Sequence, residues 1–312
     1  MEYTNYGNTG LRVSRVGLGC GGHSRLGLFS GGESVARGVV KHALDLGINF
    51  YDTARIYGTE HVVGDALFGE RQHCVFSTKT LVLDREGGFI SPDQIIRSLE
   101  KSLSRLRTDY IDIFNLHGVR PKELEFCLQN YIEPLLKEVD KGKIRYLGVT
   151  ELFEEDTSHM MLEKALDQDI FDSVMVGFNL LNPSARQKIF PICNERKVGT
   201  QVMFAVRRAL SDYERINKAI AELVEQDEVD KGLIDEGNPL GFVVENQHVG
   251  SIVEAAYRFC SREFGVDLVL VGTGSKNHLS HNVDAINGDA LPKEILERLD
   301  ALFGEVSSVS GD

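Results

Sequence analysis

The chain has 312 residues, of which 42% are hydrophobic, with 31 glycines and 7 prolines, a composition typical of a globular protein with ample material for a core. Its formal net charge of -13 argues against general nucleic-acid binding and against anionic membrane surfaces, although it permits a local basic pocket for a phosphorylated ligand. Five scattered cysteines without a CxxC pair indicate neither a zinc site nor a disulfide framework.

The N-terminal stretch MEYTNYGNTG lacks the basic-then-apolar pattern of a signal peptide, and no apolar run approaches the roughly 18 residues of a membrane span. We therefore expect a cytoplasmic protein without a membrane partner. The turn residues NTG at 8–10, followed by LRVS, predict an N-terminal hairpin that could close the bottom of a barrel.

Eight short apolar runs follow along the chain and predict β-strands. Most are almost continuously apolar rather than alternating, which is typical of parallel strands covered on both faces. They occupy residues 15–19, 48–52, 74–79, 110–117, 144–150, 173–178, 201–206 and 267–274.

Helical patterns separate these runs. Residues 33–46 place apolar side chains on one stripe, and Gly47 follows as a stop signal. Ser91 and Pro92, with Gln94 three residues after the serine, predict a helix start with a capping box. Eight strand–helix units in one chain fit a (β/α)8 TIM barrel that forms a single domain over residues 1–312.

A doubly wound sheet is the alternative architecture. It requires a glycine-rich phosphate turn that leads directly from an early strand into a helix. GLGCGG at 17–22 is the candidate, but the predicted helix at 33–46 begins too late after it. The barrel is therefore the preferred interpretation.

A long polar connection follows the seventh predicted strand. Residues 207–249 contain the acidic run EQDEVD and end in a glycine-rich stretch. Structureless loops of this length are uncommon in compact domains and are usually functional or partly helical. A substrate-covering lid and a solvated excursion are both open interpretations of this insertion.

Four polar residues lie at neighbouring strand ends of the predicted barrel. Asp52, Lys79 and His117 end the second, third and fourth strands, and Tyr57 lies in the loop after the second. Each alone has an ordinary explanation as a turn cap, a packed ring, a solvated lysine or a core histidine. Together they meet at the C-terminal rim, where barrel enzymes assemble their active sites.

This set is suited to moving a proton. An adjacent ammonium favours the anion of a phenol, so Lys79 is expected to lower the pKa of Tyr57. Asp52 can hold Lys79 protonated, and His117 can donate to a substrate oxygen. Because no side chain supplies a hydride, proton donation by Tyr57 to a carbonyl implies a nicotinamide cofactor.

Several motifs in matching order resemble the aldo-keto reductases: GINFYDTARIYG, FSTK, LSRLRTDYIDIFNLH, GKIRYLGVT and VGTGS followed by HLSHN. The resemblance covers essentially the whole chain. It implies that Asp52, Tyr57, Lys79 and His117 form the catalytic tetrad, with Tyr57 as general acid or base. It also implies a (β/α)8 barrel that binds an extended nicotinamide dinucleotide without a Rossmann motif.

The positions that hold the nicotinamide in that family are partly altered here. Thr150 and Glu151 replace the usual serine and asparagine, and Met175 replaces the usual glutamine. Thr150 and Asn179 remain predicted cofactor-binding residues. Phe204 best matches the aromatic residue that stacks on the nicotinamide, with plain core packing as the alternative.

The stretch GTGSKNHLSHN at 272–282 is predicted to bind the cofactor's phosphates and adenine. Backbone amides after the eighth strand can bind an anion, and they belong to Gly272, Thr273, Gly274 and Ser275. His278 replaces the arginine that grips the 2′-phosphate in many relatives, so Lys276 is expected to supply the charge, unless it is an ordinary solvated lysine. Asn282 is expected to read adenine. NADP(H) is therefore favoured as cofactor, with NAD(H) as the alternative.

The sequence thus predicts an oxidoreductase that acts on a small aldehyde, ketone or sugar. An NAD-dependent sugar dehydrogenase is one alternative. A cofactor-binding regulatory subunit that senses redox state with slow turnover is another; the altered nicotinamide positions favour it and the intact tetrad opposes it. No metal or nucleic-acid partner is predicted, and the sequence specifies neither the substrate nor the oligomeric state.

Overall fold

A closed barrel of eight parallel strands forms the centre of the computed structural model, which describes residues 1–235, 237–245 and 248–311. Going round the barrel, the strands are β3 (Val16–Gly19), β4 (Phe50–Asp52), β5 (Val75–Leu81), β6 (Ile111–Val119), β7 (Ile144–Glu151), β8 (Ser173–Gly177), β9 (Gly199–Met203) and β10 (Leu268–Val271). β10 pairs with both β9 and β3, which closes the sheet. The predicted (β/α)8 architecture is confirmed.

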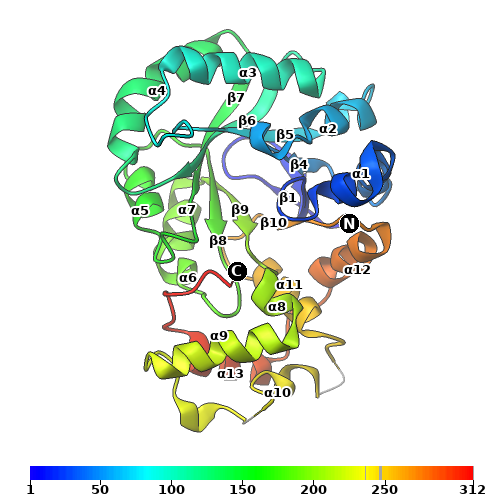
Figure 1. The fold of residues 1–312 in the computed structure, drawn as a ribbon, viewed down its shortest axis with the longest axis vertical. Coiled ribbons are helices and arrows are strands. Elements are labelled where there is room, and N and C mark those ends of the chain that lie inside the picture. The colour runs from blue at the N-terminus through cyan, green and yellow to red at the C-terminus, as the bar shows by residue number, and fades with distance from the viewer. Residues whose placement is uncertain (236, 246–247, 312) are drawn as a thin grey trace.

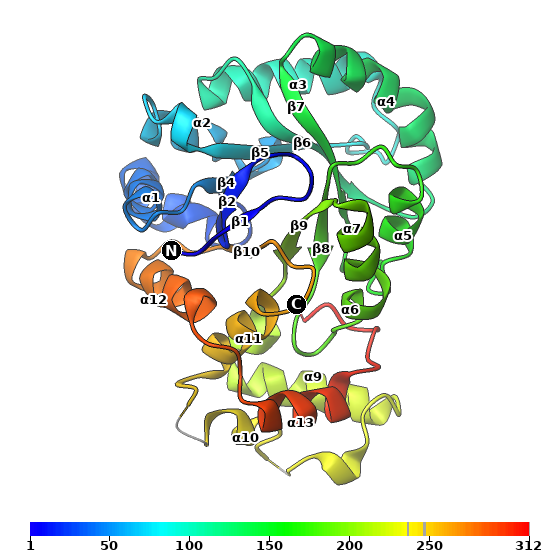
Figure 2. The ribbon, with the colours of Figure 1, turned by 180° about the vertical axis from the view of Figure 1, so that it is seen from behind.

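Helices surround this barrel on its outside (Figures 1 and 2). They are α1 (Leu28–Asp45), α2 (Glu60–Ala66), α3 (Pro92–Leu106), α4 (Leu124–Asp140), α5 (Met160–Leu166), α6 (Ala185–Lys188), α7 (Phe190–Arg196), α8 (Arg208–Ser211), α9 (Tyr213–Glu225), α10 (Gly241–Val244), α11 (Ile252–Ser261), α12 (Lys276–Asn287) and α13 (Lys293–Phe303). Short 3-10 helices are η1 (Arg25–Gly27), η2 (Arg55–Tyr57), η3 (Arg71–His73) and η4 (Lys231–Leu233). Over the described ranges, none of these helices has the length and apolarity needed to cross a membrane.

The predicted start of α3 is confirmed in detail. The Ser91 hydroxyl accepts from the Gln94 amide at 3.3 Å, and the Gln94 side chain accepts from the Ser91 amide at 2.7 Å. This capping box satisfies two backbone donors at the helix terminus. α1 begins earlier than its apolar stripe predicted, at Leu28, and Gly32, with a φ of 74°, interrupts its helical geometry.

The N-terminal hairpin consists of β1 (Tyr3–Asn5) and β2 (Arg12–Ser14), which pair antiparallel. Tyr6 and Val13 of this segment pack against inward-facing barrel residues, namely Phe50, Val75, Ile113 and Leu268. The Tyr6 hydroxyl also lies 2.5 Å from the Ser173 hydroxyl of β8. The hairpin therefore closes the N-terminal end of the barrel, as predicted, and leaves the opposite end for chemistry.

The insertion at 207–249 contains helices α8, α9, η4 and α10; its residues 236, 246 and 247 lie outside the described ranges. Ile216, Ile220 and Leu223 form one face of α9 and are buried. Figure 1 shows α9, α10 and α13 together beyond the barrel. This apolar stripe belongs to the hydrophobic core, so α9 is packed, and the substrate-covering lid stays a prediction.

Candidate active site

The four residues predicted to carry the chemistry lie on three neighbouring strands and one loop. Asp52 is the last residue of β4, Lys79 lies in β5, His117 lies in β6, and Tyr57 ends η2 after β4. The three strands are adjacent in the barrel. Parallel strands bring their C-terminal ends to the same rim, so the chain order of these residues becomes a spatial cluster.

Asp52 and Lys79 form a buried ion pair. The Lys79 ammonium donates to both carboxylate oxygens of Asp52, at 2.5 and 2.6 Å, and the two residues are only 1% and 3% exposed. Burial alone would lower the pKa of Lys79, but the Asp52 carboxylate raises it. Lys79 therefore keeps its charge at neutral pH, as predicted from its position beside an acid.

The Tyr57 phenol lies against this charged lysine. The Lys79 nitrogen is 5.1 Å from the centre of the Tyr57 ring. Burial raises the pKa of Tyr57, and the Lys79 ammonium opposes that rise without cancelling it. The expected effect of Lys79 is present, but the net shift is opposite to the prediction, so the phenol is protonated throughout the neutral range.

His117 completes the cluster. Its Nε2 is 3.5 Å from the Tyr57 hydroxyl, and the two rings meet edge to face with centroids 5.7 Å apart. Burial lowers the pKa of His117 well below the ordinary value, and Lys79 adds to that effect. The imidazole is therefore neutral at pH 7 and carries one N–H donor.

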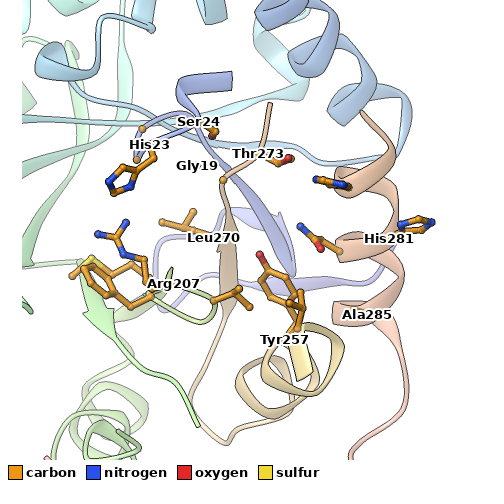
Figure 3. Close-up of a pocket in the computed structure, with 18 of the residues that line it drawn as sticks. Gly19, His23, Ser24, Arg207, Tyr257, Leu270, Thr273, His281 and Ala285 are labelled. Carbon is orange, nitrogen blue, oxygen red and sulfur yellow. The ribbon is translucent and has the colours of Figure 1, made fainter. Parts of the chain in front are cut away.

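A cavity of about 1030 Å³ opens beside Tyr57 and extends to α12. In Figure 3, His23 and Arg207 lie on one side of Leu270, whereas Tyr257 and α12 lie on the other. Asp52 and Tyr57 line the cavity, together with Gly19 at the end of β3 and Gly21 and Gly22 of the turn that follows. The cluster of Asp52, Tyr57, Lys79 and His117 therefore meets the cavity through Asp52 and Tyr57.

Phe204 lines this cavity with Met175 and Met203. Its φ of 67° is unusual for a bulky side chain, and conformations of this kind concentrate at functional sites. The predicted ring is thus placed at a cavity wall. Phe153 packs against it edge to face, with centroids 5.3 Å apart.

Two predicted cofactor residues are engaged elsewhere. The Thr150 hydroxyl accepts from the Gly118 amide at 2.7 Å. The Asn179 amide group donates to the Ser310 carbonyl at 3.0 Å, and its oxygen accepts from the amides of Leu181 and Asn182. Neither residue lines the cavity. The Thr150 side chain joins β7 to β6 instead, and the Asn179 side chain stabilises a turn and the C-terminal segment.

One part of the predicted phosphate-binding stretch lines the cavity, and another part caps α12. Gly272, Thr273 and Asn282 line the cavity. Ser275 caps α12 by accepting from the His278 amide at 3.4 Å. Three of the predicted cofactor residues in this stretch do not line the cavity, namely Gly274, Ser275 and Lys276.

Lys276 turns toward α1. Its ammonium lies 3.5 Å from the position that a Cβ on Gly38 would occupy. His278 and His281 of α12 line the cavity instead. The cation expected from Lys276 is therefore directed away from the cavity, and two imidazoles are present in its place.

Sequence reasoning missed several lining residues. Arg207 stacks over the Phe204 ring at 4.1 Å and pairs with Glu154 at 3.1 Å. Ser251, Glu254 and Tyr257 belong to the start and body of α11. Ser251 and Glu254 form a capping signal that was present in the sequence. No signal in the sequence indicated which face of α11 lines the cavity.

Comparisons with known proteins agree with this architecture. A model of the aldo/keto reductase family matches residues 21–303. An uncharacterized oxidoreductase of Bacillus subtilis, YqkF, is 25% identical over 96% of this chain and 95% of its own. The holo form of aldo-keto reductase AKR11C1 from Bacillus halodurans superposes with a TM-score of 0.73 at 25% identity, covering 99% of this chain and 100% of the other. An aldo-keto reductase from Klebsiella pneumoniae, solved in complex with NADPH, has a TM-score of 0.70 at 23% identity, covering 100% and 99%.

Proposed function

Because the chain belongs to the aldo/keto reductase family of oxidoreductases, we propose that it reduces a small aldehyde, ketone or sugar carbonyl reversibly, with NADP(H) as hydride carrier. The observation that carries this proposal is the cluster in which Lys79 pairs with Asp52 and lies beside Tyr57, and Tyr57 lies beside His117. Asp52 and Tyr57 of this cluster line the cavity. The NADPH bound by the Klebsiella relative supports the choice of cofactor.

The residues of the cavity fit an extended dinucleotide. A volume of about 1030 Å³ is at the upper end of the about 300–1,000 Å³ usual for ligand sites. A Cβ on Gly22 would meet no atom within 4 Å, so the turn after β3 borders open space. Gly272 and Thr273 would hold phosphate, Asn282 adenine and Phe204 the nicotinamide ring. Bound there, the cofactor supplies the hydride.

Thr150, Asn179, Gly274, Ser275 and Lys276 have weaker support as cofactor ligands. None of these five residues lines the cavity. Ser275 and Gly274 can still contribute through the backbone and the helix cap that shape the loop. A direct side-chain contact from Thr150, Asn179 or Lys276 would require a rearrangement on binding.

Proton transfer follows from the tetrad. Tyr57 gives its hydroxyl proton to the carbonyl oxygen while the carbonyl carbon is reduced, and the resulting phenolate is stabilised by Lys79. Asp52 keeps Lys79 charged and aimed. Neutral His117 donates an N–H to the same substrate oxygen and thereby orients the carbonyl.

The direct test is Tyr57→Phe. It should preserve folding and NADPH binding, measured by circular dichroism and by fluorescence titration, while lowering turnover by at least about two orders of magnitude, the scale of general acid catalysis. Turnover is followed by the absorbance of the reduced cofactor with a panel of aldehydes, ketones and aldoses. Wild-type-like turnover of the variant would refute the role of Tyr57.

The same panel separates catalysis from regulation. A wild-type protein that binds NADPH tightly but reduces no member of the panel would favour the redox-sensing regulatory alternative. A higher kcat/KM with NADH than with NADPH would overturn the cofactor assignment.

A further inference from the structure

Glu151, at the end of β7, carries a carboxylate that is shielded from solvent and turned away from the cavity. It accepts from the Gly177 amide of β8 at 2.7 Å and faces His159 Nδ1 at 2.9 and 3.0 Å. Both side chains are 0% exposed. A carboxylate buried this deeply is tolerated only with such partners.

His159 is held on both of its ring nitrogens. Nε2 lies 3.0 Å from the Ser184 hydroxyl. That hydroxyl donates to the Asn182 side-chain oxygen at 2.6 Å, so it accepts from His159. The Asn182 amide group donates to the Thr157 and Val309 carbonyls, which fixes its orientation. His159 Nε2 therefore carries a proton.

The remaining proton lies between Glu151 and His159. Whether it sits on the imidazole or on the carboxyl group, the pair has no net charge and both of its polar ends are satisfied. Burial raises the pKa of Glu151, and His159 opposes that rise. The pair is thus a fixed structural unit with no path to the cavity solvent.

This unit supports an aromatic stack. Phe153 lies flat on the His159 ring, with centroids 5.3 Å apart and planes 13° from parallel. Its other neighbours are Gly177, where an added Cβ would lie 2.2 Å from the ring, and the edge-on ring of Phe204. Phe153 is therefore confined between the buried pair and the cavity wall.

Two residues of the stack have unfavourable backbone conformations. His159 has a φ of 66° and Phe204 a φ of 67°. Such conformations persist only where surrounding contacts over-determine them. The hydrogen bonds of His159 and the packing of Phe153 provide that constraint, and without them the Phe204 turn would be free to relax.

We propose that Glu151 and His159 are positioning residues that fix Phe153 and, through it, the Phe204 wall of the cavity, so that they set the affinity for the nicotinamide cofactor without joining proton transfer. The inference rests on the proposed function, because Phe204 is assigned there as the nicotinamide wall. On this proposal Glu151 acts on the cofactor through His159 and Phe153 rather than by direct contact.

The test compares Glu151→Ala with the conservative Glu151→Gln. Glu151→Ala removes the partner of His159 and should raise the Kd for NADPH about tenfold, equivalent to about 1.4 kcal/mol, as measured by fluorescence titration. The kcat at saturating NADPH and its pH profile should change by less than about twofold. Glu151→Gln should restore the Kd to within about threefold, since its amide can accept from Gly177 and donate to His159.

Phe153→Leu tests the same path without altering a charge. It removes the ring that transmits the position of His159 and should raise the Kd for NADPH to a similar extent. If Glu151→Ala fails to fold, Phe153→Leu and Glu151→Gln still decide the proposal. An unchanged Kd in folded Phe153→Leu would overturn it.

Asp112→Asn is the matched control. Asp112 is a buried carboxylate at the opposite end of the barrel, paired with Arg71 at 2.7 Å and Arg145 at 3.0 Å. Its substitution should lower thermal stability and leave the Kd for NADPH unchanged. An equal rise in Kd would show that any loss of buried charge loosens the cavity, which would overturn the specific path.

Titration of the wild-type protein with NADPH distinguishes failure of the proposed function from failure of this inference. A wild-type protein that does not bind NADPH contradicts the proposed function itself. A wild-type protein that binds NADPH, with variants of Glu151 and Phe153 that bind it equally well, contradicts this inference alone. A loss of kcat with a shifted pH profile in Glu151→Ala would place Glu151 in proton transfer and refute its positioning role.

Discussion

Gly21 offers the sharpest test of how the structure places the Tyr57 phenol. An alanine Cβ at this position would lie 2.5, 2.6 and 2.7 Å from three atoms of the Tyr57 ring. Ordinary contacts of a Cβ begin near 3.4 Å. Gly21→Ala therefore forces the ring to move by about 1 Å, because atoms in a packed interior cannot overlap.

The expected loss follows from this displacement. The Tyr57 hydroxyl lies 3.5 Å from His117 Nε2, and the Lys79 nitrogen lies 5.1 Å from the ring centre. A misplacement of about 1 Å in an active site can cost about 10²-fold in rate, equivalent to about 2.7 kcal/mol of barrier. We expect kcat for carbonyl reduction to fall by about that factor while NADPH binding is kept within about threefold.

The assay is a double-mutant cycle measured by steady-state kinetics. If Gly21 acts only by placing Tyr57, Gly21→Ala should cost nothing further in a Tyr57→Phe background, because the hydroxyl it misplaces is already absent. Unchanged kcat in Gly21→Ala would refute the steric argument. If the fold-losses in kcat of the two single variants multiply in the double variant, Gly21 acts on another part of the site.

Two further predictions concern charge. Lys79→Met removes the cation that opposes the burial-driven rise in the pKa of Tyr57. The alkaline rise of kcat/KM for alcohol oxidation should therefore move to higher pH by about one unit or more. An unchanged pH profile would show that Lys79 does not influence the ionisation of Tyr57. His278→Ala should raise the Kd for NADPH about tenfold with little change for NADH, because His278 lines the cavity beside Asn282. Lys276→Ala should change neither Kd by more than about twofold, because its ammonium lies beside Gly38 of α1. A larger effect from Lys276→Ala would return the phosphate contact to Lys276.

The barrel and the clustering of Asp52, Tyr57, Lys79 and His117 could be predicted because their signals are local. Continuous apolar runs mark strands covered on both faces, and a polar residue at the C-terminal end of such a run lies at the rim. Asp52, Lys79 and His117 needed only the topology to bring them together. The capping box at Ser91 similarly specifies its helix start through neighbours in the chain.

The side chains by which a helix faces the cavity were harder to predict from the sequence. Lys276 and His278 are two residues apart at the start of α12, and a helix turns about 100° per residue, so a one-residue difference in register reassigns the cavity-facing residue. His278 lines the cavity and Lys276 does not. Only the packing of α12 against α1 resolves this choice, and that packing is long-range.

The insertion at 207–249 illustrates a different failure. Ile216, Ile220 and Leu223 have helical spacing and are buried, but the many charged residues around them left a lid and a solvated excursion equally open. The partner of this apolar stripe could not be named from the local sequence. Elsewhere in the insertion, Arg298 of α13 stacks over Phe242 of α10 at 4.2 Å and pairs with Asp235 at 2.6 Å.

The protonation of the site favours one direction of the proposed reaction. Burial keeps His117 neutral and raises the pKa of Tyr57, so at neutral pH the free site holds a phenol that can donate a proton and an imidazole that can donate an N–H. Carbonyl reduction needs both groups in that form, whereas alcohol oxidation needs the phenolate. A sugar dehydrogenase built on this site would therefore work best at alkaline pH, and the same residues are poised for reduction at pH 7.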